Sequence, residues 1–392
     1  MALTSADGHT VWANSLALSL LGIHEDSENP PGGELVRDEQ GRLTGILRES
    51  AVFAVRELAA SPLSGNLETQ LLSAQRHLLS HGITSVHDID GPDAHAAFVS
   101  LRQQGLLDLR VHKLLAVGEL ESAITAGLRS YEGDGWISRG AVKIFSDGAA
   151  GSHTCHMSEP FADDESNVGM EVTAYSELVR LVGTAAEAGI AVAIHAIGDR
   201  ANHLALNALA GASEATGRHA LRHRVEHAQF LLPSDVDRFA SLGVIASMQP
   251  QHCPSDVPLL GMIAGPDLAS YAWKSLLRSG AEVVFGSDSP IEPAIPLKGI
   301  HAALKRTTPA GEPPGGWDPA ERLSLAEALH GYCVAPAFAS GEEKLKGLLR
   351  PGMLSDFIVL DQDPFALPTH EVKHVRVQST VVGGVERYHR EA

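Results

Sequence analysis

Four side chains that can bind a metal ion lie at or near the ends of separate apolar runs of this sequence. Lys143 lies in AVKIFSD, His195 in IAVAIH, His227 in RVEH and Asp288 in VVFGSD. Imidazole and carboxylate groups are the usual ligands of Zn²⁺ and related divalent ions. If these runs are strands of one parallel sheet, the side chains meet at one rim, and we predict a metal site there.

Lys143 is unusual because it lies in the second half of a run that is typical of a buried strand. A buried ammonium group is costly unless it is paired or loses its proton. A neutral, desolvated lysine amine can react with CO₂ to give a carbamate, which is a bridging carboxylate for metal ions. This reaction would remove the buried positive charge.

Each residue also has an ordinary structural interpretation. His195 could be a hydrogen-bonded core histidine. Lys143 could extend to the rim, and Asp288 could cap the turn before Ser-Pro. These explanations would have to coincide at every strand end, so the combination favours a metal site although no single residue does.

Glu226 is a carboxylate inside the run RVEH. It precedes His227 by one residue, and side chains alternate between the two faces of a strand. We therefore expect Glu226 to point away from the barrel lumen and to support the structure rather than catalysis.

The elements that must position these residues alternate along the chain. Short apolar runs are separated by segments of helical period, which predicts a parallel sheet because each helix returns the chain to the same end. The runs are GITSVHD (82–88), LRVHKLLAV (109–117), AVKIFSD (141–147), IAVAIHAIG (190–198), HRVEHAQ (223–229), GVIASMQP (243–250) and EVVFGSD (282–288).

This alternation favours an α/β fold of the (β/α)₈ TIM-barrel type. Such a barrel has eight strands and about 250 residues, and its active site lies where the strands end. A doubly wound sheet is the competing architecture, but no G-x-G-x-x-G phosphate loop follows a first strand here. Because we find seven runs, we prefer a barrel with one strand unaccounted for.

Two regions lie outside the alternation. Residues 1–60 contain the turn-rich PPGGE and DEQGR, and we predict an insertion or lid segment. Residues 61–342 are predicted to form the barrel, from strand two to strand eight. Residues 343–392 are rich in Val, Ile and Thr around a Gly-Gly turn, which predicts a small β-module.

The composition excludes several kinds of partner. The chain has 392 residues, 44% of them apolar, and a formal net charge of −18. It can therefore bury a large core, and we expect neither nucleic acid nor an anionic membrane as a partner. Three widely spaced cysteines without C-x-x-C do not predict a disulfide framework. With no signal peptide and no apolar run of spanning length, we expect a cytoplasmic protein that acts on a small molecule.

Several segments, taken together, resemble a known family. They are DGHTVWANSLAL, GITSVHD, GAVKIFSDGAAGSHT, AVAIHAIGDRA, HRVEHAQ, SMQPQH with Asp256 following, VFGSDSP and GLLRPGMLSDFIVLDQDP. They resemble the amidohydrolase superfamily of metal-dependent hydrolases, most closely its N-substituted formamide deformylase-like branch, over essentially the whole chain. HAIGDRA and GSDSP are the specific motifs, whereas the tail pattern is shared by many amidohydrolases.

The resemblance implies a role for each residue at the strand ends. Lys143 would be the carboxylated lysine that bridges two metal ions, and His195 and His227 would bind the second of them. Asp288 would bind the first and act as general base. The metal would be Zn²⁺, with Mn, Fe or Co as alternatives. The C-terminal residues 343–392 would be the remnant of a composite β-sandwich built from both chain ends.

One feature of the family is missing. The resemblance implies H-x-H at the end of the first barrel strand, and this chain contains no H-x-H. His153 with His156 and His219 with His223 have the wrong spacing. We therefore expect an N-terminally truncated chain, with a circular arrangement or a strand supplied by a partner as alternatives. The unpaired strand edges would favour a homodimer or poor solubility.

Further residues near the strand ends are candidates for substrate binding. His9 lies in DGHTVWANS, and Asp199 and Arg200 directly follow the run that carries the first histidine ligand. Asp199 could equally be a helix N-cap. Gln249 lies near the end of the run GVIASMQP and His252 just beyond it, in a segment that suits substrate selection.

The favoured hypothesis is a metal-dependent hydrolase that cleaves an amide-like, non-peptide C–N bond. A metal-activated water would attack the carbonyl, and Asp288 would move the proton to the leaving nitrogen. Two alternatives are open: a truncated, catalytically incompetent amidohydrolase-like fragment, and a metal-independent TIM-barrel lyase or isomerase. Loops, which vary independently of the barrel, would decide the substrate.

Overall fold

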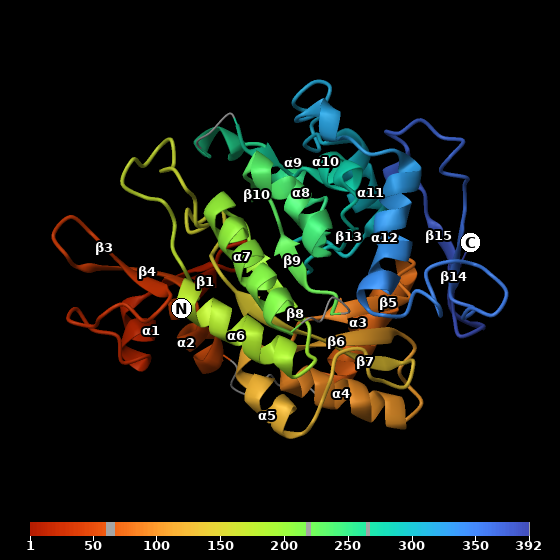
Figure 1. The fold of residues 1–392 in the computed structure, drawn as a ribbon, viewed down its shortest axis with the longest axis horizontal. Helices are drawn as coiled ribbons and strands as arrows, with labels where there is room; N and C mark the ends of the chain where they lie inside the picture. The colour runs from red at the N-terminus through yellow and green to blue at the C-terminus, as the bar shows by residue number, and fades with distance from the viewer. Residues whose placement is uncertain (60–66, 217–220, 264–266, 392) are drawn as a thin grey trace.

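The seven predicted strands form one parallel sheet in the computed structural model of the protein (Figure 1). The structure describes residues 1–59, 67–216, 221–263 and 267–391. The strands are β5 (Ser85–Asp88), β6 (Arg110–Ala116), β7 (Ile137–Phe145), β8 (Val192–Ala196), β9 (Arg224–His227), β11 (Ile245–Met248) and β13 (Val283–Phe285).

The order of these strands confirms the predicted α/β fold. Chain neighbours are also sheet neighbours, in the order β13-β11-β9-β8-β7-β6-β5, and every pair is parallel. A barrel winds in this single direction, whereas a doubly wound sheet reverses its order. Within the described ranges β13 and β5 are the two edges of the sheet, and no strand joins them.

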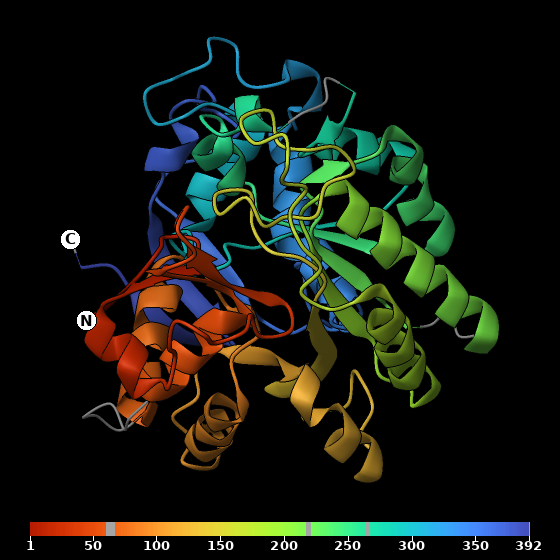
Figure 2. The same cartoon turned by 90° about the vertical axis from the view of Figure 1, so that its left-hand side faces the viewer.

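Helices cover the outer side of the curled sheet, as the green helices in Figure 2 show. Val142, Ile144, Val192 and Ile194 alternate along β7 and β8 and belong to the main hydrophobic core with residues of these helices. No helix in the described part of the chain is long and apolar enough to cross a membrane. The helices are α3 (Leu67–Ser80), α4 (Pro92–Gln103), α5 (Leu120–Thr125), α6 (Tyr175–Glu187), α7 (Asp199–Thr216), α8 (Pro233–Leu242), α9 (His252–Asp256), α10 (Trp273–Ser279), α11 (Pro296–Lys305) and α12 (Leu325–Ala339).

The inner side of the sheet changes character along the strands. Ala141, Ala191 and Ala193 form a small apolar cluster with a leucine of β6. Polar residues follow toward the C-terminal ends of the strands, where the register pairs His195 of β8 with Glu226 of β9. All strand ends of a parallel sheet share one edge, so this register gathers the polar side chains at one rim.

Residues 1–59 form an antiparallel sheet with the order β1-β2-β4-β3 and two helices. Its core contains Val11, Leu35, Leu47 and Val52 and is separate from the main core. The predicted boundary between residues 60 and 61 lies outside the described residues, and the lid role stays a prediction. The elements are β1 (Ala2–Thr4), β2 (Thr10–Ala13), α1 (Ser15–Leu20), β3 (Gly33–Arg37), β4 (Leu43–Glu49) and α2 (Ser50–Ala59).

A second antiparallel sheet, with the order β14-β15-β16, lies on the opposite side of the parallel sheet (Figure 1). Its strands are β14 (Phe357–Leu360), β15 (Val377–Val382) and β16 (Val385–His389). Gly383 and Gly384 join the last two with φ of 61° and 78°, the left-handed conformation that the predicted Gly-Gly turn requires. The short strands β10 (Phe230–Leu231) and β12 (Ala269–Ser270) form a separate pair.

Candidate metal centre

Three side chains converge beyond the ends of β9, β11 and β13. His227 ends β9, His252 begins α9, and Asp288 follows β13. One ligand atom from each lies within 4.8 Å of the other two, and together they could hold a metal ion. His227 and Asp288 are predicted ligands, whereas His252 is predicted to contact substrate.

The backbone turns sharply at two of these residues. The φ angles of His227 and Asp288 are 74° and 56°, and Ala228 has a φ of 45°. Residues other than glycine rarely adopt this left-handed region, which costs of order 1–3 kcal/mol at each position and is concentrated at functional sites. The chain therefore leaves strand geometry at two of the side chains that could hold a metal ion.

The prediction that Glu226 points away from the lumen is wrong. Val225 packs in the main core against the helices, whereas Glu226 lies on the opposite, inner side and pairs with Arg224 at 2.5 Å. The negative charge of Glu226 acts on Lys143. The prediction assigned Glu226 to the face opposite His227 because the two residues are adjacent. This fails because the left-handed backbone of His227 breaks the alternation of side chains along β9.

His195 and Lys143 lie beside the cluster. The ring centroid of His195 is 4.4 Å from that of His227. Burial, and then the nearby Lys143 charge, lower the pKa of His227 well below its ordinary value. Burial, followed by the charges of His227 and Lys143, does the same to the pKa of His195. Both imidazoles are therefore neutral, which is the form that binds metal ions.

Lys143 is buried, with its Nζ 4.7 Å from the ring centroid of Phe145. Burial lowers its pKa, although the carboxylates of Glu226 and Asp288 favour the charged form. Lys143 therefore gives up its proton more readily than a lysine in water.

His252 and Asp288 form an ion pair, with 3.3 Å between Nε2 and Oδ2. Burial lowers the pKa of His252, but hydrogen bonds with Asp288 and Glu292 outweigh it and raise that pKa to about 9. Burial raises the pKa of Asp288, and the hydrogen bond with His252 reverses this and lowers it. A metal ion that uses His252 as a ligand must therefore displace its proton.

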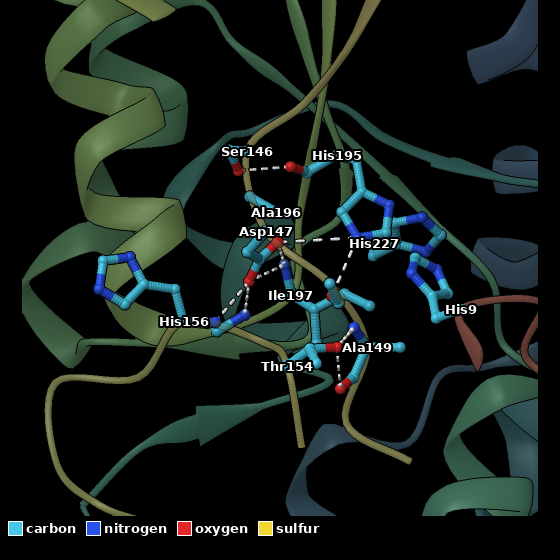
Figure 3. A network of polar contacts seen from close by, with 12 residues as sticks. His9, Ser146, Asp147, Ala149, Thr154, His156, His195, Ala196, Ile197 and His227 are labelled. Atoms are coloured by element: carbon cyan, nitrogen blue, oxygen red, sulfur yellow. Dashed lines mark hydrogen bonds and ion pairs between the residues drawn. The ribbon is translucent and has the colours of Figure 1, made fainter. Parts of the chain in front are cut away.

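The N-terminal sheet contributes His9 to the same rim. The His9 ring centroid is 5.4 Å from that of His195, and Figure 3 shows both rings next to His227. His9 Nδ1 lies 2.8 Å from Oε2 of Glu49, which ends β4 and also accepts a hydrogen bond from Thr154 Oγ1. Burial lowers the pKa of His9, but the contact with Glu49 outweighs this and raises it.

Asp147 is a fully buried carboxylate that the sequence analysis did not single out. It accepts hydrogen bonds from the backbone N–H groups of His156, Ile197 and Gly198 (Figure 3). Its Oδ1 lies 3.6 Å from Nε2 of His195. Burial outweighs the backbone hydrogen bonds and raises the pKa of Asp147 to about 7.

Residues 1–388 match the sequence profile of the amidohydrolase family. The chain belongs to this family. This confirms the resemblance that its motifs indicate. The fold agrees, because all seven strands lie in the singly wound parallel sheet of a barrel.

Individual relatives agree with this assignment. The amidohydrolase is 32% identical to Protein LONG AFTER FAR-RED 3 of Arabidopsis thaliana, over 98% of this chain and 68% of that protein. It is 29% identical to N-substituted formamide deformylase of Arthrobacter pascens, over 99% of this chain and 73% of that one. A solved structure of an uncharacterized metal-dependent hydrolase from Pyrococcus horikoshii OT3 superposes with a TM-score of 0.76 at 30% identity, covering 93% of this chain and 71% of that one.

The other predicted substrate contacts of this amidohydrolase lie at different places. Asp199 is fully buried at the start of α7 and accepts hydrogen bonds from the N–H and Oγ of Ser158. Arg200 is exposed. Gln249 is buried, and its Oε1 lies 2.9 Å from Nδ1 of His227. Gln249 therefore contacts a predicted ligand directly, whereas Asp199 holds the loop after β7.

Glu49 and Asp147 were not predicted as site residues, for different reasons. Glu49 belongs to a different sheet from the predicted ligands and reaches them only through tertiary packing. Asp147 follows the strand that carries Lys143 by two residues, and its polar type at that position was the available signal. His219, weighed as an alternative histidine, lies outside the described residues.

Proposed function

We propose that this amidohydrolase is a metal-dependent hydrolase of an amide-like, non-peptide C–N bond in a small molecule. The observation that carries the proposal is the convergence of His227, His252 and Asp288 within 4.8 Å at the strand ends. Family membership supports hydrolysis. The relative named N-substituted formamide deformylase supports the C–N bond, and the metal-dependent hydrolase from Pyrococcus horikoshii supports the metal.

The side chains fit a divalent metal ion. The neutral imidazoles of His195 and His227 and the carboxylate of Asp288 suit Zn²⁺, our first candidate, as well as Mn, Fe or Co, whereas His252 would first have to lose its proton. His227, His252 and Asp288 would hold one ion, and His195 with Lys143 would hold a second. An ion bound here would make a water more acidic and polarise the substrate carbonyl.

Lys143 is proposed to act as a carbamate. Its neutral amine attacks the carbon of CO₂, an N–C bond forms, and the nitrogen loses a proton to solvent. Its burial and its lowered pKa support this reaction, because they increase the population of the reactive neutral amine.

Asp288 is proposed to move the proton of the reaction. As water adds to the carbonyl carbon, the Asp288 carboxylate accepts one of its protons and passes it to the nitrogen as the C–N bond breaks. Its lowered pKa keeps the carboxylate ionised and ready to accept at neutral pH. His9 is proposed to contact the substrate, which its contact with Glu49 and its position beside His195 support.

Asp288→Asn tests this role. We expect the variant to lose about 10²–10⁴-fold or more of kcat, the usual contribution of a general acid–base residue. Hydrolysis of a panel of N-substituted formamides would be measured together with zinc content by inductively coupled plasma mass spectrometry. Asp235→Asn is the matched control, because Asp235 is a buried carboxylate that instead pairs with Arg238.

A second candidate is an amidohydrolase-like protein without catalytic activity, favoured by the lack of H-x-H. A folded wild type that takes up neither Zn²⁺ nor Mn²⁺ and hydrolyses none of the panel would establish it. Full activity in Asp288→Asn would overturn only the proposed proton-transfer role of Asp288 and would leave the hydrolase proposal standing. Activity that survives complete removal of metal would instead favour a metal-independent reaction.

A further inference from the structure

The hydrogen bonds of Gln249 determine which nitrogen of His227 carries a proton. Nε2 of Gln249 lies 3.3 Å from the carbonyl oxygen of Ser247, and Oε1 lies 2.9 Å from Nδ1 of His227. A carbonyl oxygen only accepts, so the amide NH₂ must face Ser247 and the amide oxygen must face the histidine. That oxygen also only accepts, so Nδ1 carries the proton and Nε2 keeps its lone pair.

The neighbouring His195 has the opposite arrangement. Its Nε2 lies 3.1 Å from the carbonyl oxygen of Gly148, so Nε2 carries the proton and Nδ1 keeps the lone pair. The acceptor for His195 is a backbone carbonyl oxygen, which no side-chain substitution at Gly148 would remove. The acceptor for His227 is the side chain of Gln249, so its effect on the tautomer can be tested by mutation.

We propose that Gln249 is a positioning residue that holds His227 as its Nδ1–H tautomer and so leaves Nε2 available to a metal ion. A metal-binding histidine commonly donates its other N–H to an oxygen that fixes the ring and its tautomer. Without this acceptor, the proton can move to Nε2 and block that nitrogen as a ligand. The metal-binding part of this inference rests on the proposed function, whereas the tautomer is a property of the protein without metal.

Gln251 provides a matched control. Gln249 and Gln251 are 6% and 7% exposed in the same segment after β11. Gln251 donates to the carbonyl oxygen of Pro293 at 2.9 Å. Gln251→Met and Gln249→Met each remove one buried amide, with one hydrogen bond lost at Gln251 and two at Gln249. Gln251→Met leaves His227 with its acceptor.

Nitrogen-15 NMR of histidine-labelled, metal-free protein reads the tautomer directly. The His227 signals would be assigned from their loss in His227→Asn. We expect a protonated Nδ1 in wild type, Gln249→Glu and Gln251→Met, because each keeps an oxygen acceptor beside the ring. In Gln249→Met we expect the proton to shift toward Nε2.

Chelator competition then measures zinc affinity. We expect Gln249→Met to bind zinc about 10–100-fold more weakly, the usual effect of losing a residue that orients a ligand. Gln249→Glu and Gln251→Met should remain close to wild type, whereas a merely structural role would weaken binding equally in both methionine variants.

Three results would overturn the inference: a wild-type His227 protonated on Nε2, an unchanged tautomer in Gln249→Met, or equal zinc affinities in the two methionine variants. The first does not require Gln249→Met, so the inference stays testable if that variant does not fold. Failure of the proposed function gives a different result, in which wild type shows the Nδ1–H tautomer but binds no zinc.

Discussion

At the scale of single residues, burial sets the direction of the pKa shift for several ionisable groups near the centre. It keeps His195 and His227 neutral and lowers the pKa of Lys143. His252 differs because its contacts with carboxylates outweigh burial. Histidine therefore occurs here both as a neutral imidazole and as a charged partner of carboxylates, and its sequence neighbours do not distinguish the two.

His223 allows a test of burial away from the centre. It is buried, its Nδ1 accepts a hydrogen bond from the Val192 N–H at 3.1 Å, and burial lowers its pKa to about 4. The folded pKa lies below the unfolded value of about 6.5. The stability from neutral His223 is therefore fully present above pH 6.5 and is lost as the pH falls toward 4.

We expect His223→Gln to flatten this pH dependence, because the glutamine oxygen can accept the same hydrogen bond but does not titrate. Between pH 7 and pH 4 wild type should lose about 3 kcal/mol more unfolding free energy than the variant. Urea denaturation across this range measures the difference. Parallel pH profiles for the two proteins would contradict the assigned pKa.

At the scale of elements, the antiparallel N-terminal sheet supplies part of the site that the barrel strands do not contain. Glu49 ends β4 with a φ of 52° and joins His9 to Thr154 of the loop after β7. The contact between β4 and that loop spans more than a hundred positions of the chain. Strand periodicity contains no information about such a contact.

Glu49→Ala should remove the contact between the N-terminal sheet and the loop after β7. We expect the unfolding free energy to fall by about 1–3 kcal/mol, because His9 and Thr154 lose a buried partner. Activity should fall while zinc content is unchanged, since Glu49 contacts none of the proposed ligands directly. Glu34→Ala is the control, because the partly exposed pair of Glu34 with Arg48 in the same sheet should contribute at most about 1 kcal/mol. Equal effects of the two substitutions would contradict this role.

At the scale of the whole molecule, a buried ion pair joins the C-terminal sheet to the parallel sheet. The Arg110 guanidinium of β6 binds both carboxylate oxygens of Asp356, at 2.6 and 3.0 Å. Thr380 of β15 also donates to the carbonyl oxygen of Leu79 at the end of α3. These contacts make the last three strands part of the same packed structure.

Asp356→Ala should destabilise this attachment by about 3–5 kcal/mol, because it leaves the buried Arg110 without its partner. Denaturation and limited proteolysis would report the loss, with earlier cleavage between α12 and β14. Asp361→Ala is the comparison, since its longer contact with Arg390, at 3.7 Å, is partly exposed and should contribute at most about 1 kcal/mol. If both variants were equally stable, the ion pair would not hold the sheet.

Apolar periodicity was sufficient to predict the parallel sheet and the strand ends that carry Lys143, His195, His227 and Asp288. It was insufficient for Glu226, because the left-handed backbone of His227 breaks the alternation on which that prediction depended. The roles of the four residues as ligands stay predictions until a metal is measured.

The sequence alone therefore specifies local features, namely which segments become strands and which polar residues lie at their ends. Which side chains meet at those ends depends on tertiary packing. It brought His252 to Asp288, Glu49 to His9 and Gln249 to His227. The physical reason is that strand and helix periods come from short-range burial patterns, whereas these contacts join segments far apart in the chain and depend on how whole sheets pack and where the backbone turns.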